Sequence, residues 1–101
     1  MDAVNWLNEW YKSNCDGDWE HCYQIKIETL DNPGWWVKID LNDTELENQF
    51  FEKIAINNSE DDWLFCRVEN NIFSSSGDPN KLIKILEIFR QWAESLKEAK
   101  R

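Results

Sequence analysis

The amino-acid sequence predicts an α+β fold, in which an antiparallel sheet of four or five strands carries an N-terminal and a C-terminal helix packed on it. Three observations support this prediction. Apolar residues recur at helical spacing near both ends of the chain, they alternate with polar residues through the middle, and a strong turn sequence, Asp31–Gly34, separates two alternating runs. With 101 residues, the chain is expected to form one domain, residues 1–101, around one core.

The first predicted element is a short helix over Asp2–Lys12, because Asp2 can cap its first turn and apolar residues recur at helical spacing. These apolar residues are Ala3, Trp6, Leu7 and Trp10. From Trp19 the spacing changes to two, which predicts a first strand over Trp19–Thr29. The residues expected on its inward face are Trp19, His21, Tyr23, Ile25, Ile27 and Thr29.

A second strand is predicted over residues 35–41, and it forms a hairpin with the first. Its apolar face carries Trp35, Val37, Ile39 and Leu41, and its polar face carries Trp36, Lys38 and Asp40. Alternation therefore directs Trp36 outward among charged side chains. An outward tryptophan ringed by charges is typical of an interface anchor. The alternative is a tryptophan that a loop or the other helix covers.

The rest of the chain is predicted to contain two or three more strands and a long helix. Residues 42–49 are expected to form a loop, Phe50–Asn57 a third strand with Phe50, Ile54 and Ile56 in phase, and Trp63–Glu69 a fourth strand with Leu64, Cys66 and Val68 inward. Residues 70–77 fit either a short strand or a loop. Asp78 and Pro79 are expected to start the C-terminal helix. Its apolar stripe is Leu82, Ile85, Leu86, Phe89, Trp92, Ala93 and Leu96.

The charge of the chain limits its partners. The formal net charge is −9, and residues 1–80 hold 17 acids against 5 bases, a net charge of −12. Such a body repels phosphate backbones and attracts a basic partner, so no nucleic acid is expected as a ligand. No apolar run reaches membrane-spanning length, and the N-terminus lacks the pattern of a secretion signal, so no membrane partner is expected. Three cysteines at unrelated spacings suit free thiols in the cytoplasm.

Residues 15–22, with the sequence CDGDWEHC, hold the densest set of reactive and chelating side chains. A zinc site needs four ligands, and the soft candidates Cys15, His21, Cys22 and Cys66 contain no C-x-x-C pair, so no metal and no cofactor are expected. An enzyme that uses His21 with a neighbouring acid or with the Cys66 thiol is an alternative. Because the sequence lacks a phosphate-binding loop, a G-x-S-x-G motif and a second histidine, we expect no catalytic residues.

Several motifs resemble those of the immunity protein 53 family, small bacterial proteins of polymorphic toxin systems. They are CDGDWEH at residues 15–21, TLDNPGW at residues 29–35 and V-x-I-D-L at residues 37–41. The flanking W-L-x-x-W-Y at residues 6–11, the pair Asp62-Trp63, and Gly77-Asp78-Pro79 before a helix are also similar. The resemblance implies a protein that binds a cognate toxin tightly in the cytoplasm and blocks it. A basic site on that toxin, such as the active site of a nuclease, would match the acidic body.

The predicted partner-binding residues are Asp16, Asp18, Glu20, Trp36 and Asp40. A second set is expected to maintain the structure of the two central motifs: Trp19, His21, Asp31, Asn32, Pro33, Gly34 and Trp35. If the first strand is extended, the two motifs lie roughly 30 Å apart, at about 3.3 Å per residue. They are therefore not expected to form one compact patch. A non-catalytic scaffolding module that uses Trp36 as its contact is a further alternative.

Overall fold

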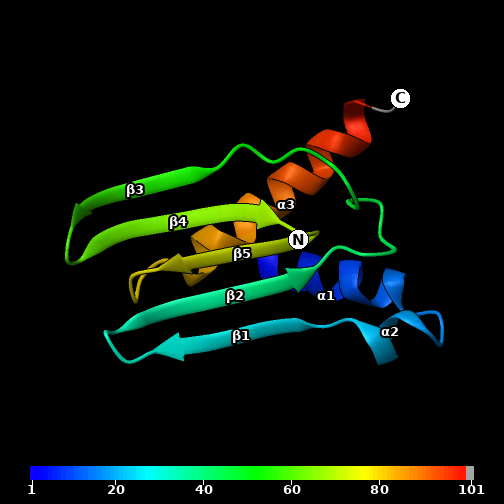
Figure 1. The fold of residues 1–101 in the computed structure, drawn as a ribbon, viewed down its shortest axis with the longest axis horizontal. Coiled ribbons are helices and arrows are strands. Elements are labelled where there is room, and N and C mark those ends of the chain that lie inside the picture. Colours follow the sequence, from blue (N-terminus) through cyan, green and yellow to red (C-terminus); the bar gives the residue numbers. More distant parts are fainter. Residues whose placement is uncertain (100–101) are drawn as a thin grey trace.

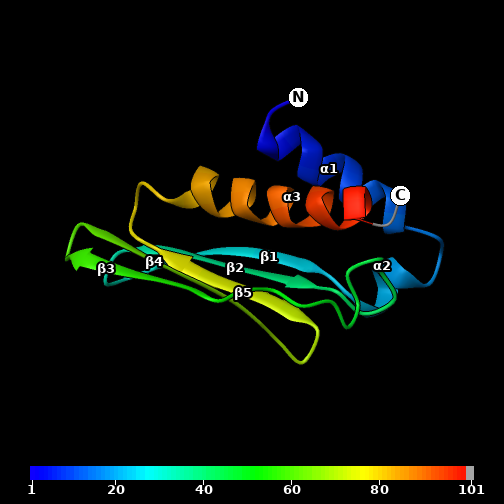
Figure 2. The same ribbon diagram turned by 90° about the horizontal axis from the view of Figure 1, so that it is seen from above.

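Five antiparallel strands form one sheet in the computed structural model of the protein, which describes residues 1–99, and helices α1 and α3 both lie on the same side of this sheet (Figures 1 and 2). The helices are α1 (Ala3–Asn14), α2 (Trp19–Cys22) and α3 (Leu82–Ala99). The strands are β1 (Ile25–Leu30), β2 (Gly34–Asp40), β3 (Ile54–Ser59), β4 (Asp62–Glu69) and β5 (Ile72–Gly77). The α+β class is confirmed, and the segment that fitted either strand or loop contains β5.

The strand order is β1-β2-β5-β4-β3, so the last strand in the sequence occupies the centre of the sheet. Strand β5 pairs with β2 on one side and with β4 on the other, and it joins the two hairpins into one sheet. Asn70 and Asn71 connect β4 to β5 with φ angles of 55° and 59°. Two successive left-handed residues form the tight turn that suits the twist of a hairpin, and asparagine tolerates this conformation well.

The core lies between the sheet and α3. Val37, Ile39 and Phe73 are fully buried on the helix-facing side of β2 and β5. Phe73 packs against Phe89 of α3, with ring centroids 5.1 Å apart. The buried residues of α3 are Ile85, Leu86, Ile88, Phe89 and Ala93. The predicted faces of β2 and β4 and most of the helix stripe are therefore confirmed. No helix within residues 1–99 combines the length and apolarity needed to cross a membrane.

The first strand is shorter than predicted, because Trp19–Cys22 form the short helix α2 and β1 begins at Ile25. In a strand, residues i and i+2 share a face, whereas in a helix they point about 200° apart. Trp19 is accordingly buried, and His21 is exposed. The expectation that His21 points inward is wrong.

The third strand also begins later than predicted, at Ile54, and Phe50 lies outside the sheet with 81% of its surface exposed. Phe51 instead enters the core, where it packs against Phe73 and Trp92 with centroid distances of 5.6 Å and 5.2 Å. The Trp92 indole N–H donates to the Phe50 carbonyl at 2.8 Å. These contacts hold the chain against α3, so it cannot join the strand ladder before Ile54.

The C-terminal helix begins at Leu82, four residues after the predicted start at Asp78. Asp78 is fully buried, and its carboxylate fixes the segment that precedes α3. Its Oδ1 accepts the N–H of Asn80 at 2.8 Å, and its Oδ2 accepts the N–H of Trp63 at 3.0 Å and the Lys81 ammonium at 2.6 Å. Asp78 therefore joins the first residues of β4 to the connection between β5 and α3.

These contacts stabilise the ionised form of Asp78. The hydrogen bond from Lys81 is the largest influence, burial opposes it, and the backbone N–H groups of Asn80 and Trp63 add to it. Together they lower the pKa of Asp78 from 3.8 to about 2. Lys81 also donates to Asp62 at 2.9 Å, so one ammonium group bridges two carboxylates.

A close backbone approach sets the position of the β1–β2 hairpin. A Cβ atom on Gly34 would lie 2.5 Å from the Gly77 carbonyl oxygen and 3.0 Å from the Trp63 ring. Gly34 is buried at this crossing, where β2 meets the end of β5. Only glycine leaves room for that contact, which explains the glycine of the turn sequence in terms of folding.

We expect Asp78→Asn to lower the melting temperature at pH 7 by about 10 °C, because Lys81 and its hydrogen-bond partners lose a buried negative charge. A depressed folded-state pKa gives stability that is present above the unfolded pKa and is lost as pH falls toward the folded pKa. The gap between the wild type and the variant should therefore close between about pH 4 and pH 2. Thermal unfolding followed by circular dichroism measures this, with exposed Asp61→Asn as the control. A gap of equal size at pH 7 and at pH 2 would contradict it.

We expect Gly34→Ala to reduce the free energy of unfolding by about 2 kcal/mol, because the added methyl group meets backbone that cannot move away easily. Urea denaturation measures the change. Gly17→Ala is the comparison: its Cβ would meet no atom within 4 Å, and only the φ angle of +97° is unfavourable, at a cost of about 1 kcal/mol. A larger loss at Gly17 than at Gly34 would refute the steric explanation.

Candidate functional site

The acid-rich segment before α2 is a tightly hydrogen-bonded cap. Asp16 Oδ1 accepts the N–H groups of Asp18 and Trp19, both at 2.9 Å. The Glu20 carboxylate in turn accepts the N–H of Asp16 at 3.0 Å and that of Gly17 at 2.9 Å. Bonds from backbone N–H groups, first that of Trp19 and then that of Asp18, lower the pKa of Asp16. Two of the three predicted partner-binding acids of this segment therefore also maintain its structure.

Trp19 anchors this cap in the molecule. Only 3% of its surface is exposed, and its indole N–H donates to the Asn42 carbonyl at 2.9 Å. Its ring packs edge-on against Trp10 and Tyr11 of α1, with centroid distances of 6.2 Å and 5.9 Å. The residues that follow Trp19 can therefore not move independently of α1 or of the loop after β2.

That loop brings further carboxylates to the same end of the molecule. Asp40 Oδ2 accepts the N–H of Gln24, just beyond α2, at 2.9 Å. Burial raises the pKa of Tyr23, and the nearby negative charges of Asp43, Glu47 and Asp40 raise it further. We define the acidic end as Asp16, Asp18, Glu20, Asp40, Asp43, Glu45 and Glu47. It surrounds α2 and the loop after β2, at the right of Figure 1.

The second sequence motif lies at the opposite end of the sheet, where β1 turns into β2 (Figure 1). Asp31, Asn32 and Pro33 are exposed. Trp35 donates its indole N–H to the Pro79 carbonyl at 3.0 Å, which ties the hairpin to the start of the helix connection. The two motifs do not form one patch, although the first strand is shorter than predicted.

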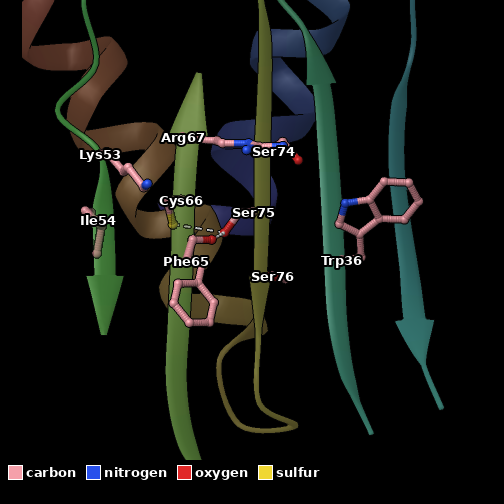
Figure 3. Close-up of a pocket in the computed structure, with 9 residues that line it drawn as sticks. All are labelled: Trp36, Lys53, Ile54, Phe65, Cys66, Arg67, Ser74, Ser75 and Ser76. Atoms are coloured by element: carbon pink, nitrogen blue, oxygen red, sulfur yellow. Dashed lines mark hydrogen bonds between the residues drawn. The ribbon is translucent and has the colours of Figure 1, made fainter. Parts of the chain in front are cut away.

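Trp36 lies on the open face of the sheet, the side away from α1 and α3 (Figures 2 and 3), and alternation along β2 places Asp40 on the same face. It is half-buried, and the Lys38 ammonium group lies 5.3 Å from its ring centroid. A groove of about 360 Å³ runs beside it across β5 to β4. Its side chains on the open face include Trp36, Lys53, Phe65, Arg67, Ser74 and Ser76.

Sequence reasoning missed the β4 and β5 residues of this groove. The alternation over Trp63–Glu69 already put Phe65 and Arg67 on the polar side, and three consecutive serines follow in β5. The missing information was strand order, because only the placement of β5 between β2 and β4 brings these residues beside Trp36.

The candidate nucleophile pair is not supported by the positions of its members. Cys66 is 1% exposed on the helix-facing side of β4, with its Sγ 2.9 Å from Ser75 Oγ. Burial raises the pKa of the Cys66 thiol, which keeps it protonated and weakly nucleophilic at neutral pH. His21 is exposed on α2. In the described part of the chain, no group of three or more His, Cys, Asp or Glu side chains could hold a metal ion.

Comparison with known protein families supports the resemblance noted in the sequence. The family model described as immunity protein 53 matches residues 4–94, which include both motifs, the whole sheet and most of α3. Comparisons with curated proteins and with solved structures gave no match. Because the family model covers most of the 101 residues, the chain belongs to the immunity protein 53 family.

Proposed function

We propose that this protein binds a cognate toxin and blocks its active site with the acidic end. Membership of the immunity protein 53 family supports a protective role. The observation that carries the mechanism is the gathering of seven carboxylates around α2 and the loop after β2. A surface of this kind complements a site lined with arginine and lysine, as in an enzyme that binds phosphate groups. The proposed target is therefore the basic active site of a nuclease.

The acidic end is suited to binding because it is rigid before the partner arrives. Hydrogen bonds of Asp16 and Glu20 fix the cap, and Trp19 attaches it to α1. Within residues 1–99, the side chains of Asp18, Glu45 and Glu47 make no hydrogen bond or ion pair. Because the backbone beneath these charges is already fixed, binding has to order only their side chains, so more of the electrostatic attraction appears as affinity.

The proposal includes a cytoplasmic site of action. Cys15 and Cys22 are exposed free thiols, and Cys66 is a buried one. Free thiols persist in reducing compartments, whereas oxidising compartments favour disulfides. The partner in this proposal is the toxin alone, without nucleic acid or membrane, and the protein performs no catalysis.

We expect the triple variant Asp18→Lys, Glu45→Lys and Glu47→Lys to lose about 100-fold in affinity for the toxin encoded beside its gene, because it replaces attraction by repulsion at the centre of the contact. Asp16 and Glu20 are left unchanged, since they maintain the cap. Titration calorimetry gives the affinity, and growth during co-expression with the toxin reports protection. The association rate of the wild type should also fall as the salt concentration rises from about 50 to about 500 mM, because salt screens the charges that steer the encounter.

The matched control is Asp31→Lys, Glu60→Lys and Asp61→Lys, which changes the net charge equally in exposed turns at the other end of the sheet. It should bind within about threefold of the wild type, because these turns lie far from the proposed contact. Circular dichroism verifies that both variants fold. Equal losses in the two variants would show that only net charge matters, and no loss in the first would refute the acidic end as the binding site.

A further inference from the structure

The open face of the sheet differs in charge from the rest of the acidic body. Residues 1–80 contain five basic residues, and four of them are on or beside this face, whereas Lys12 is in α1. The four are Lys26, Lys38, Lys53 and Arg67. A random distribution would place the five bases on the helices, on both faces of the sheet and in the loops. Glu28, Asp40 and Glu69 share this face, so its four bases and three acids give it a charge of +1, on a protein whose net charge is −9.

Strand register arranges the side chains of the open face in rows. Ser76 of β5 pairs with Trp36 of β2 on one side and with Phe65 of β4 on the other, which makes an aromatic row with a small residue at its centre. Ser74 pairs in the same way with Lys38 and Arg67, which makes a cationic row. Because neighbouring strands lie about 4.8 Å apart, the backbones that flank each row are about 10 Å apart.

We call the part of the groove that has Ser74 and Ser76 of β5 at its floor, between the larger side chains of β2 and β4, the trough. The side chains of these serines are short, while Phe65 borders them on β4 with 39% of its surface exposed, and Trp36 borders them on β2 with its indole turned toward β1 (Figure 3). The groove of about 360 Å³ has room for one or two side chains of a partner. Neither α1 nor α3 covers it, because both helices pack on the other side of the sheet (Figure 2).

The two rows determine which side chains of a partner fit the trough. The gap between Trp36 and Phe65 suits a flat or branched apolar side chain. The space between Lys38 and Arg67, above the Ser74 hydroxyl, suits a carboxylate, which would replace Glu69 in the exposed ion pair that it forms with Arg67 at 3.5 Å. Adjacent rows are two residues apart along each strand, or about 7 Å, and this equals the spacing of side chains i and i+2 in an extended peptide.

We propose that this trough is a second docking surface for the toxin, which receives an extended toxin segment with an apolar side chain and a carboxylate two residues apart. The inference rests on the proposed function, because it takes the toxin as the partner. It adds a contact of opposite charge to the acidic end: there the toxin contributes basic groups, and here it contributes an acid. Local charge complementarity is the reason for choosing an acidic segment.

A single-stranded nucleic acid also uses aromatic rings and basic side chains, but the next row of the face opposes it. Ile72 pairs with Asp40 and with Glu69, so two carboxylates flank the row beyond Lys38 and Arg67. A phosphate chain that continued along the trough would meet these charges and the net charge of −9. A peptide needs only one carboxylate at the cationic row and then continues uncharged.

The test compares the affinity of two double variants for the toxin encoded beside the gene, measured by titration calorimetry. Phe65→Ser with Arg67→Glu removes one wall of the trough and reverses one cation. We expect it to weaken binding by about thirtyfold. Ile83→Ser with Lys84→Glu makes the same kind of change at exposed positions of α3 and should bind within about twofold of the wild type. The single variant Arg67→Glu, at an exposed position, serves if the double variant fails to fold.

Each outcome decides a separate question. If the trough variant binds like the helix variant, the second docking surface is refuted, while protection by the wild type leaves the proposed function intact. If the wild type neither binds the toxin nor protects against it, the proposed function fails and the inference fails with it. A ten-residue oligothymidylate that binds the wild type and not the trough variant would assign the face to nucleic acid and overturn the peptide proposal.

Discussion

The packing of Phe89 determines how the layers of this protein are arranged. From α3 its ring contacts Phe73 of the central strand at 5.1 Å and Trp10 of α1 at the same centroid distance, and it meets Trp6 at 5.9 Å. One side chain therefore joins both helices to β5. Because aromatic burial supplies a large share of the stability of a small domain, both helices stay on one side of the sheet. The other side remains open, and α2 is left at the end of the molecule.

This arrangement allows a concentration of negative charge that would otherwise oppose folding. Seven carboxylates at one end repel one another, and net charge of one sign destabilises a compact state. Backbone N–H groups offset part of this cost at Asp16, where they lower the pKa. Trp19 adds its packing against Trp10 and its hydrogen bond to Asn42. The acidic end is thus held together by apolar and backbone contacts, which leaves its charges available to a partner.

Local patterns predicted those features that depend on neighbours in sequence. Alternation identified the faces of β2 and β4, and the helical stripe identified Phe89. Alternation misled at Trp19–Cys22, because the capping bonds of Asp16 and Glu20 favour a helical turn over the strand that the spacing indicates. The central position of β5 could not be derived, since it depends on pairing with a strand more than thirty residues away. For the same reason four acids of the acidic end were named from the sequence, Asp16, Asp18, Glu20 and Asp40, whereas the groove between Trp36 and Phe65 was not.

Strand β2 connects the two proposed contacts, since its outward residues pass from Asp40 at the acidic end to Lys38 and then to Trp36. A partner that follows this strand meets negative charge, positive charge and an aromatic ring at intervals of about 7 Å. An acidic surface alone would attract any basic protein in the cell, including many that must remain free. A second contact of opposite sign penalises those proteins, because their basic groups would face Lys38 and Arg67. In the proposed arrangement, attraction at the acidic end accelerates the encounter, and the trough decides which partner stays bound.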